Sequence, residues 1–332
     1  MAKEDYKGIW VFAEQQNGKL NSAVLEILAK AQELKAHTGE EITAVLLGHE
    51  VSGISSELFA YGADQVIVAE NPALASYSAR PYQTALTQLA EKYMPSIILY
   101  AATSLGRDLA PRMMVSLKTG LTADAIDLGF DQDEVFYQTT PAYGGSILAH
   151  IVILESRPQM ATVRPMMFEP IQPREGASGK LITETVSVDA DADYEVLATA
   201  PKQDTGDSIE GAQVIVAGGR GIKEASDLDS LKELTELLGG KLASSRPLVD
   251  NGWLPHEKQI GQSGATIKPK YIFNIAISGS VQYQVGMQNA GCVISINHTK
   301  GAPIFDISHY GAVADYKTVI PALVEEIKRR KA

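Results

Sequence analysis

Short apolar, β-branched runs alternate with amphipathic segments through the first hundred residues of this chain. Each run is apolar almost throughout, which is the pattern of a strand buried on both faces of a parallel sheet. Residues 21–36 instead repeat apolar side chains at helical spacing, and further helices are predicted at 79–93 and after Ser104. The pattern predicts a Rossmann-like α/β domain with right-handed crossovers. Its strands are predicted at 9–14, 42–48, 65–69 and 96–103.

The pattern changes after about residue 128, where strand-like segments separated by turn residues replace the alternation. We expect these segments to add antiparallel strands to the first sheet. They are 134–140, 146–156, 159–165 and 180–188.

A linker is predicted at 188–211, because this stretch is acidic and almost free of large apolar residues. The alternation of strands and helices resumes after it, with strands at 213–217, near 271–277 and at 292–297. Helices are predicted at 227–238 and from 316. We therefore predict an N-terminal α/β domain over 1–200 and a doubly wound parallel-sheet domain over 201–332.

Charge and composition exclude several classes of function. A formal net charge of −11 argues against nucleic acid or an anionic membrane surface as a partner, since both require a basic surface. No apolar run approaches the roughly 20 residues of a membrane span. The first residues resemble neither a signal peptide nor a transit peptide, so we expect a cytoplasmic protein. A single cysteine excludes internal disulfides, and the six histidines lack metal-site spacing.

Glycine-rich and polar signals follow the apolar runs of the last third. Since ligands bind at the carboxyl ends of strands in an open parallel sheet, these signals predict one long ligand along one sheet edge. In VIVAGGRG at 214–221, bare glycine amides can approach a pyrophosphate, and Arg220 can clamp a phosphate. Arg246, before a proline in SSRPL, can counter a negative charge on a ligand or, alternatively, form a surface ion pair.

Two further turns offer neutral hydrogen-bonding groups. GQSG at 261–264 places an amide and a hydroxyl between glycines, which suits the edge of a heteroaromatic ring. The segment 278–283 places serines at a predicted helix N-terminus, with Gln282 and Tyr283 expected to point back toward the ligand. Asn297 and Asp315 close apolar runs and can hold a ribose or an adenine. Each residue also has a plain interpretation as a capping or turn residue.

The order and spacing of these motifs resemble a known family. GGRG, SSRPLVDNGW, QIGQSG, ISGSVQ and APIFDISHYGAVAD together resemble the C-terminal FAD domain of the electron-transfer flavoprotein alpha (large) subunit. ATSLGRDLAPRMMVSLKTGLTAD at 102–124 extends the resemblance to the first domain. The resemblance implies FAD contacts at Arg220, Ser245, Arg246, Ile260, Gly261, Gln262, Ser263, Ser278, Gly279, Ser280, Val281, Gln282, Tyr283, Asn297 and Asp315.

The resemblance also implies roles for single residues. Arg246 would lie against the isoalloxazine ring and stabilise reduced, negatively charged flavin. Ser263 would donate its hydroxyl toward flavin N5, where many family members have threonine. Two departures bear on the charge near the ring: Tyr283 stands where histidine is frequent, and His309 stands where relatives often have an acidic residue.

As a family member, the chain would be an electron carrier that binds FAD without metal or catalytic side chains. It would pair with a smaller beta subunit through the first domain and exchange electrons with a dehydrogenase of the acyl-CoA dehydrogenase type. The sequence is compatible with a simple member of the family and with an electron-bifurcating member, which uses NADH and ferredoxin. Three alternatives stay open: an NAD(P)-binding oxidoreductase subunit, an NAD-consuming deacylase, and a nucleotide-sensing subunit without redox turnover. The absence of a GxGxxG motif from the sequence counts against the first of them.

Overall fold

The computed structural model describes residues 3–142, 147–193, 196–198 and 208–331. The chain divides into two compact units, Met1–Thr199 and Ala200–Ala332. Much of the predicted linker, at 194–195 and 199–207, lies outside the described residues. Among the helices of the described part, none has the length and apolar character that a membrane span requires.

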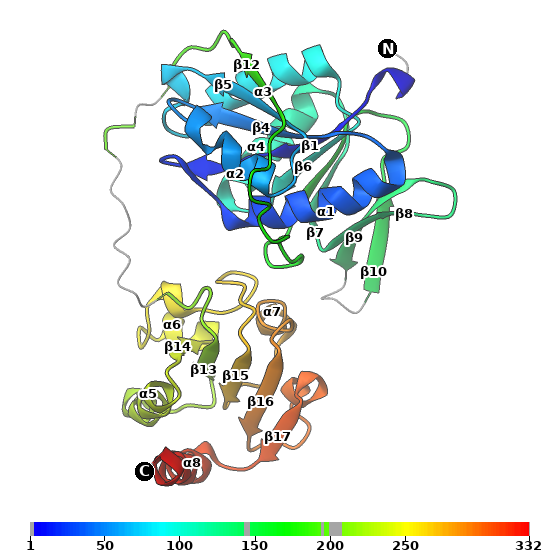
Figure 1. Ribbon diagram of the computed structural model, residues 1–332. Coiled ribbons are helices and arrows are strands. Elements are labelled where there is room, and N and C mark those ends of the chain that lie inside the picture. The colour runs from blue at the N-terminus through cyan, green and yellow to red at the C-terminus, as the bar shows by residue number, and fades with distance from the viewer. Residues whose placement is uncertain (1–2, 143–146, 194–195, 199–207, 332) are drawn as a thin grey trace. The chain divides into compact units, whose positions relative to one another are not determined.

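The N-terminal unit is built on a seven-stranded parallel sheet (Figure 1). Alternate side chains of its central strand enter opposite cores: Ile9 and Val11 pack on one face, and Trp10 and Phe12 on the other. Both faces are therefore covered, as continuous apolar runs require. The strand order is β12 (Lys180–Glu184), β5 (Gln65–Glu70), β4 (Ile42–Gly48), β1 (Ile9–Phe12), β6 (Ile97–Ala101), β11 (Gln159–Val163) and β7 (Leu121–Ala125).

Helices cover the two faces of this sheet. The face of Ile9 carries α1 (Ser22–Thr38) and α2 (Ser55–Ala60), and the opposite face carries α3 (Ala79–Tyr93) and α4 (Ser104–Ser116). Helix α1 begins where the Asn21 side chain accepts a hydrogen bond from the amide of Ala23 and ends at Gly39 in the left-handed conformation. A two-stranded hairpin of β2 (Gln15–Gln16) and β3 (Lys19–Leu20) follows β1.

The antiparallel strands predicted for this domain form a three-stranded sheet of their own. It consists of β8 (Asp127–Phe130), β9 (Phe136–Ala142) and β10 (Ile147–Val152). The segments at 159–165 and 180–188 depart from our expectation, because β11 and β12 join the main sheet in parallel. Strand β11 lies between β6 and β7 and pairs with both, and it is buried along its whole length, as an interior strand is.

The C-terminal unit is a five-stranded, fully parallel sheet (Figure 1). Its order is β14 (Lys241–Ser244), β13 (Val214–Gly218), β15 (Tyr271–Ile275), β16 (Cys292–Asn297) and β17 (Tyr310–Val313). On one face, α5 (Leu228–Leu237) and α8 (Tyr316–Lys331) pack against Val216 and Ile275. The other face carries α7 (Val281–Gln284), a 3₁₀ turn η7 (Pro303–Ile307) and the buried Ile260 and Ile267.

The strand order creates a topological switch point in this domain. From β13 the chain passes to β14 on one side and then returns to β15 on the other. At such a point the connections leave in opposite directions and open a crevice beyond the carboxyl ends of the strands. The predicted ligand motifs at 218–221, 245–246 and 277–280 directly follow these three strands. The fold therefore brings them to one edge.

Candidate functional site

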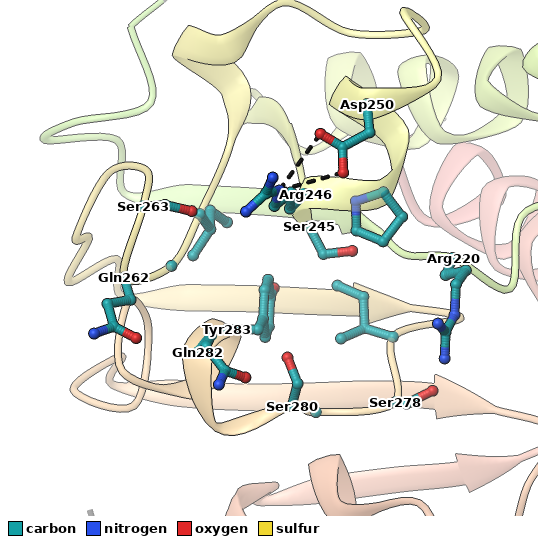
Figure 2. A pocket seen from close by; sticks show the side chains of 15 residues that line it. Arg220, Ser245, Arg246, Asp250, Gln262, Ser263, Ser278, Ser280, Gln282 and Tyr283 are labelled. Carbon is teal, nitrogen blue, oxygen red and sulfur yellow. Dashed lines mark hydrogen bonds and ion pairs between the residues drawn. The ribbon is translucent and has the colours of Figure 1, made fainter. Parts of the chain in front are cut away.

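A cavity of about 560 Å³ lies at this edge of the C-terminal sheet. It is formed by the turns that follow β13 and β15, by α6 (Arg246–Asp250) after β14, and by the loop at 260–263 (Figure 2). Its lining residues are Arg220, Ser245, Arg246, Pro247, Asp250, Ile260, Gly261, Gln262, Ser263, Ile277, Ser278, Gly279, Ser280, Gln282 and Tyr283.

The turn after β13 requires glycine because two backbone segments touch there. A Cβ on Gly219 would lie 2.5 Å from the carbonyl oxygen of Ala276 and 2.5 Å from the Ile277 side chain. The amide of Gly219 donates to the Ile275 carbonyl at 2.9 Å, and that of Gly221 donates to Ala276 at 3.1 Å. These bonds hold the turn against the end of β15. They also occupy the amides of Gly219 and Gly221, so these two amides are not left for a pyrophosphate as the sequence suggested. Arg220, between the two glycines, is exposed and lines the cavity.

The turn after β15 is constrained in the same way. Gly279 has a φ of 81°, and a Cβ there would lie 2.4 Å from the amide nitrogen of Ile304. That amide donates to the carbonyl of Ser278 at 3.0 Å, which ties the turn to η7. Ser278 and Ser280 remain exposed beside the cavity. Two bare turns with hydroxyl groups beside them suit the close approach of phosphate oxygens.

The loop at 260–264 is fastened to the start of α7. Gly261 has a φ of 132°, and the amide of Gln262 donates to the Gln282 carbonyl at 2.8 Å. The Gln259 side chain donates to both the carbonyl and the hydroxyl of Ser263, at 3.0 and 2.9 Å. Since the hydroxyl of Ser263 accepts this bond, its own proton is left to donate to a ligand.

An ion pair spans the short helix α6. The Arg246 Nε lies 3.4 and 3.3 Å from the two carboxylate oxygens of Asp250. Ser245 precedes the helix, and its amide donates to the Gly218 carbonyl at 2.9 Å. Pro247 fixes the backbone of the first turn. The arginine is thereby placed at the wall of the cavity (Figure 2).

From the sequence we expected Tyr283 to point toward the ligand. Its hydroxyl instead points away from the cavity. Only 3% of the residue is exposed, and the hydroxyl donates to the Asn274 side chain at 2.6 Å. Asn274, itself fully buried, donates in turn to the Ser295 hydroxyl at 3.3 Å. Burial raises the pKa of the Tyr283 phenol. A neutral ring, rather than a polar tip, therefore lines the cavity.

Three of the predicted contact residues lie outside this cavity. Val281 is exposed and absent from the lining. Asn297 and Asp315 line a neighbouring cavity of about 280 Å³ at the same sheet edge, with Gly221. There the Asn297 side chain donates to the Ile277 carbonyl at 2.8 Å, and the Asp315 carboxylate accepts from the Lys317 amide at 2.9 Å. The Asn297 side chain also accepts from the Thr299 amide at 2.9 Å, so Asn297 supports a turn and Asp315 caps the start of α8, which are the alternatives that the sequence left open.

The sequence interpretation missed three lining residues, Pro247, Asp250 and Ile277. For Asp250 a signal was present, because it stands four residues after Arg246 in a segment that follows a strand. A helix there brings the two side chains to the same face. Within the described residues, no group of three or more histidine, cysteine, aspartate or glutamate side chains is placed to hold a metal.

These observations define a class of protein: a two-domain α/β chain whose C-terminal domain is shaped for a dinucleotide. Two glycine turns, each packed so closely on neighbouring backbone that a Cβ would collide, bring Arg220, Ser278 and Ser280 to the wall of the cavity, and these side chains suit a pyrophosphate. The protein families that this chain matches agree with this class of protein. The electron transfer flavoprotein domain matches residues 9–191, and the electron transfer flavoprotein FAD-binding domain matches residues 208–288.

Related proteins match along almost the entire chain. The electron transfer flavoprotein subunit alpha of Thermoanaerobacterium thermosaccharolyticum is 43% identical over 98% of this chain and 99% of its own length. That of Megasphaera elsdenii is 41% identical, over 98% of both chains. Subunit LctC of a lactate dehydrogenase (NAD(+),ferredoxin) from Acetobacterium woodii is 38% identical over 98% of this chain and 78% of its own. The chain belongs to the electron-transfer flavoprotein alpha subunit family, and its C-terminal domain is an FAD-binding domain.

The geometry of Tyr283 generates a prediction. Tyr283→Phe removes the donor to Asn274 and leaves a buried acceptor unpaired, so the C-terminal domain should lose about 1–3 kcal/mol of unfolding free energy. The midpoint potential of bound FAD should not change, because the hydroxyl is directed into the core. Denaturant unfolding followed by Trp253 fluorescence, in a background in which the second tryptophan, Trp10, is replaced by phenylalanine, and a potentiometric titration measure the two quantities. Tyr271→Phe, at an exposed tyrosine of the same domain, is the matched control. A shifted potential with unaltered stability would contradict this orientation.

Proposed function

We propose that this chain holds FAD in the cavity of its C-terminal domain, with the pyrophosphate at the turns 218–221 and 278–280. The isoalloxazine ring lies between Arg246 and Ser263, and the adenosine extends toward Asn297 and Asp315. The observation that carries this assignment is the cavity at the switch point, with glycine turns beside Arg220 and with Arg246 on its opposite wall (Figure 2). The neighbouring cavity at Asn297 supports the extended pose.

Bound FAD supplies the electron-transfer chemistry, and the side chains bind, orient and tune it. Arg246 provides a positive charge where the reduced ring becomes negative. The Ser263 hydroxyl, fixed by Gln259, presents its proton toward N5. An NAD(P) subunit is the weaker assignment, because AGGRGI departs from GxGxxG and the matched family domain is one that binds FAD.

Replacing Arg246 tests the position of the ring. Arg246→Ala should lower the one-electron midpoint potential of bound FAD by about 65–130 mV, the equivalent of roughly 1.5–3 kcal/mol for a charge-assisted contact. Arg220→Ala removes an equal charge from the other side of the cavity and should weaken FAD binding with a smaller shift in potential. Potentiometric titration of the complex with its partner subunit measures both variants. An unchanged potential in Arg246→Ala would place the ring elsewhere.

An alpha subunit of this family acts with a beta subunit and with dehydrogenases. For this chain we propose that the beta subunit packs against the N-terminal domain. Strand β10 supports this assignment, because it pairs only with β9 among the described strands and carries no charged residue. Its large aliphatic side chains are exposed by 53% at Ile147, 57% at Leu148, 39% at Ile151 and 42% at Val152. Exposed apolar edges of this kind are normally covered.

Lysine substitutions on β10 test this surface. Ile147→Lys and Leu148→Lys place a charge on opposite faces of the strand, and each should sharply reduce the amount of beta subunit that co-purifies with the chain. Leu181→Lys on β12 is the matched control, since Leu181 is 49% exposed in the same domain. Circular dichroism verifies folding. Loss of the partner in the control alone, or full retention in both β10 variants, would show that β10 is not the interface.

The redox partners of this chain are proposed from its relatives. A dehydrogenase of the acyl-CoA dehydrogenase type or a similar flavin enzyme exchanges electrons with the bound FAD. The name of the Acetobacterium woodii relative includes NAD(+) and ferredoxin, which favours electron bifurcation as a second candidate function. A bifurcating complex should contain two FAD molecules per heterodimer and split the two electrons of NADH between ferredoxin and a dehydrogenase. One FAD per heterodimer would instead identify a simple carrier. The cytoplasmic location stays a prediction.

A further inference from the structure

Asp250 is the one carboxylate among the residues that line the FAD cavity. The other charged lining residues are Arg220 and Arg246. FAD brings two phosphate charges to this cavity, and its ring gains negative charge on reduction. A carboxylate at the wall repels both and disfavours the reduced ring. A physical role of the Asp250 carboxylate should therefore outweigh its repulsion of FAD.

Stability of the domain does not supply that role. The side chains of Arg246 and Asp250 are 68% and 58% exposed, and ion pairs this exposed contribute little. On a helix, a cation four residues before an anion is the weaker of the two orders. Asp250 is also the last residue of α6, where a negative charge meets the negative end of the helix dipole.

The geometry of the pair points to orientation instead. Both carboxylate oxygens of Asp250 face the Nε of Arg246, at 3.4 and 3.3 Å (Figure 2). Because the carboxylate contacts the guanidinium at Nε, the two terminal Nη groups stay open to a ligand. Pro247 and the amide bond of Ser245 fix the backbone from which Arg246 extends. A long, flexible side chain is thus restrained at both its root and its head.

We propose that Asp250 is a positioning residue that orients Arg246 toward the flavin and also keeps the midpoint potential of bound FAD lower than Arg246 alone would set it. The proposal rests on the proposed placement of the ring beside Arg246. Two effects follow. Orientation by Asp250 strengthens FAD binding, since less side-chain freedom is lost when the ligand arrives. Its negative charge offsets part of the arginine field, which opposes reduction.

Two substitutions separate these effects. Asp250→Asn keeps an acceptor for Nε and removes the charge that repels the phosphates, so FAD should bind at least as tightly as to wild type. The ratio of reduced to oxidised flavin at a fixed potential should rise by about threefold to tenfold. The tenfold limit corresponds to about 59 mV for a one-electron step. Asp250→Ala removes the acceptor too and should raise the dissociation constant of FAD by about twofold to tenfold as well.

The experiment uses the complete complex, with FAD affinity from reconstitution of the apoprotein and potentials from spectroscopic titration. Asp229→Asn is the matched control, because Asp229 pairs with Lys232 on α5 and does not line the cavity. In an Arg246→Ala background, Asp250→Ala should no longer weaken FAD binding. An unchanged potential in Asp250→Asn, or an equal loss of affinity with and without Arg246, would overturn the proposal. If Arg246→Ala itself leaves the potential unaltered, the ring placement fails instead.

Discussion

The contact of the Gly219 turn with the end of β15 is the constraint on which the FAD site depends. There the backbone of one strand-end turn touches Ala276 and Ile277 so closely that no side chain fits. Hydrogen bonds from Gly219 and Gly221 fix this approach and bring Arg220 beside the serines of the next turn. Without that contact the two turns would separate, and the cavity would lose the narrow wall that suits a pyrophosphate.

Much of this arrangement could be predicted from the sequence, because it depends on local rules. Apolar runs such as 42–48 and 214–217 indicate buried parallel strands, and in such sheets the strand ends share one edge. The motifs after these runs therefore converge wherever the connections allow it. Hence Arg220, from the β13–β14 connection, is found together with Arg246 and the loop around Ser263, which both belong to the β14–β15 connection.

The remaining features depend on tertiary packing that no local pattern encodes. The ring of Tyr283 lies at the cavity, but its hydroxyl turns inward because Asn274, on the adjacent strand, offers a buried acceptor. The sequence predicts a strand at 159–163. Its parallel direction follows from its place between β6 and β7 in the sheet. Asp250 is the exception, because its spacing of four residues from Arg246 is a local signal that our interpretation passed over. For Tyr283 and for β11, a neighbouring element distant from the local pattern decides the outcome.

The bond between the Ile304 amide and the Ser278 carbonyl has a consequence for the synthesis of the protein. The turn at Gly279 is supported by a residue that stands more than two dozen positions later in the chain, on the far side of β16. This half of the site is therefore complete only after synthesis has passed Ile304, so capture of a cofactor at this turn has to follow production of both β16 and η7.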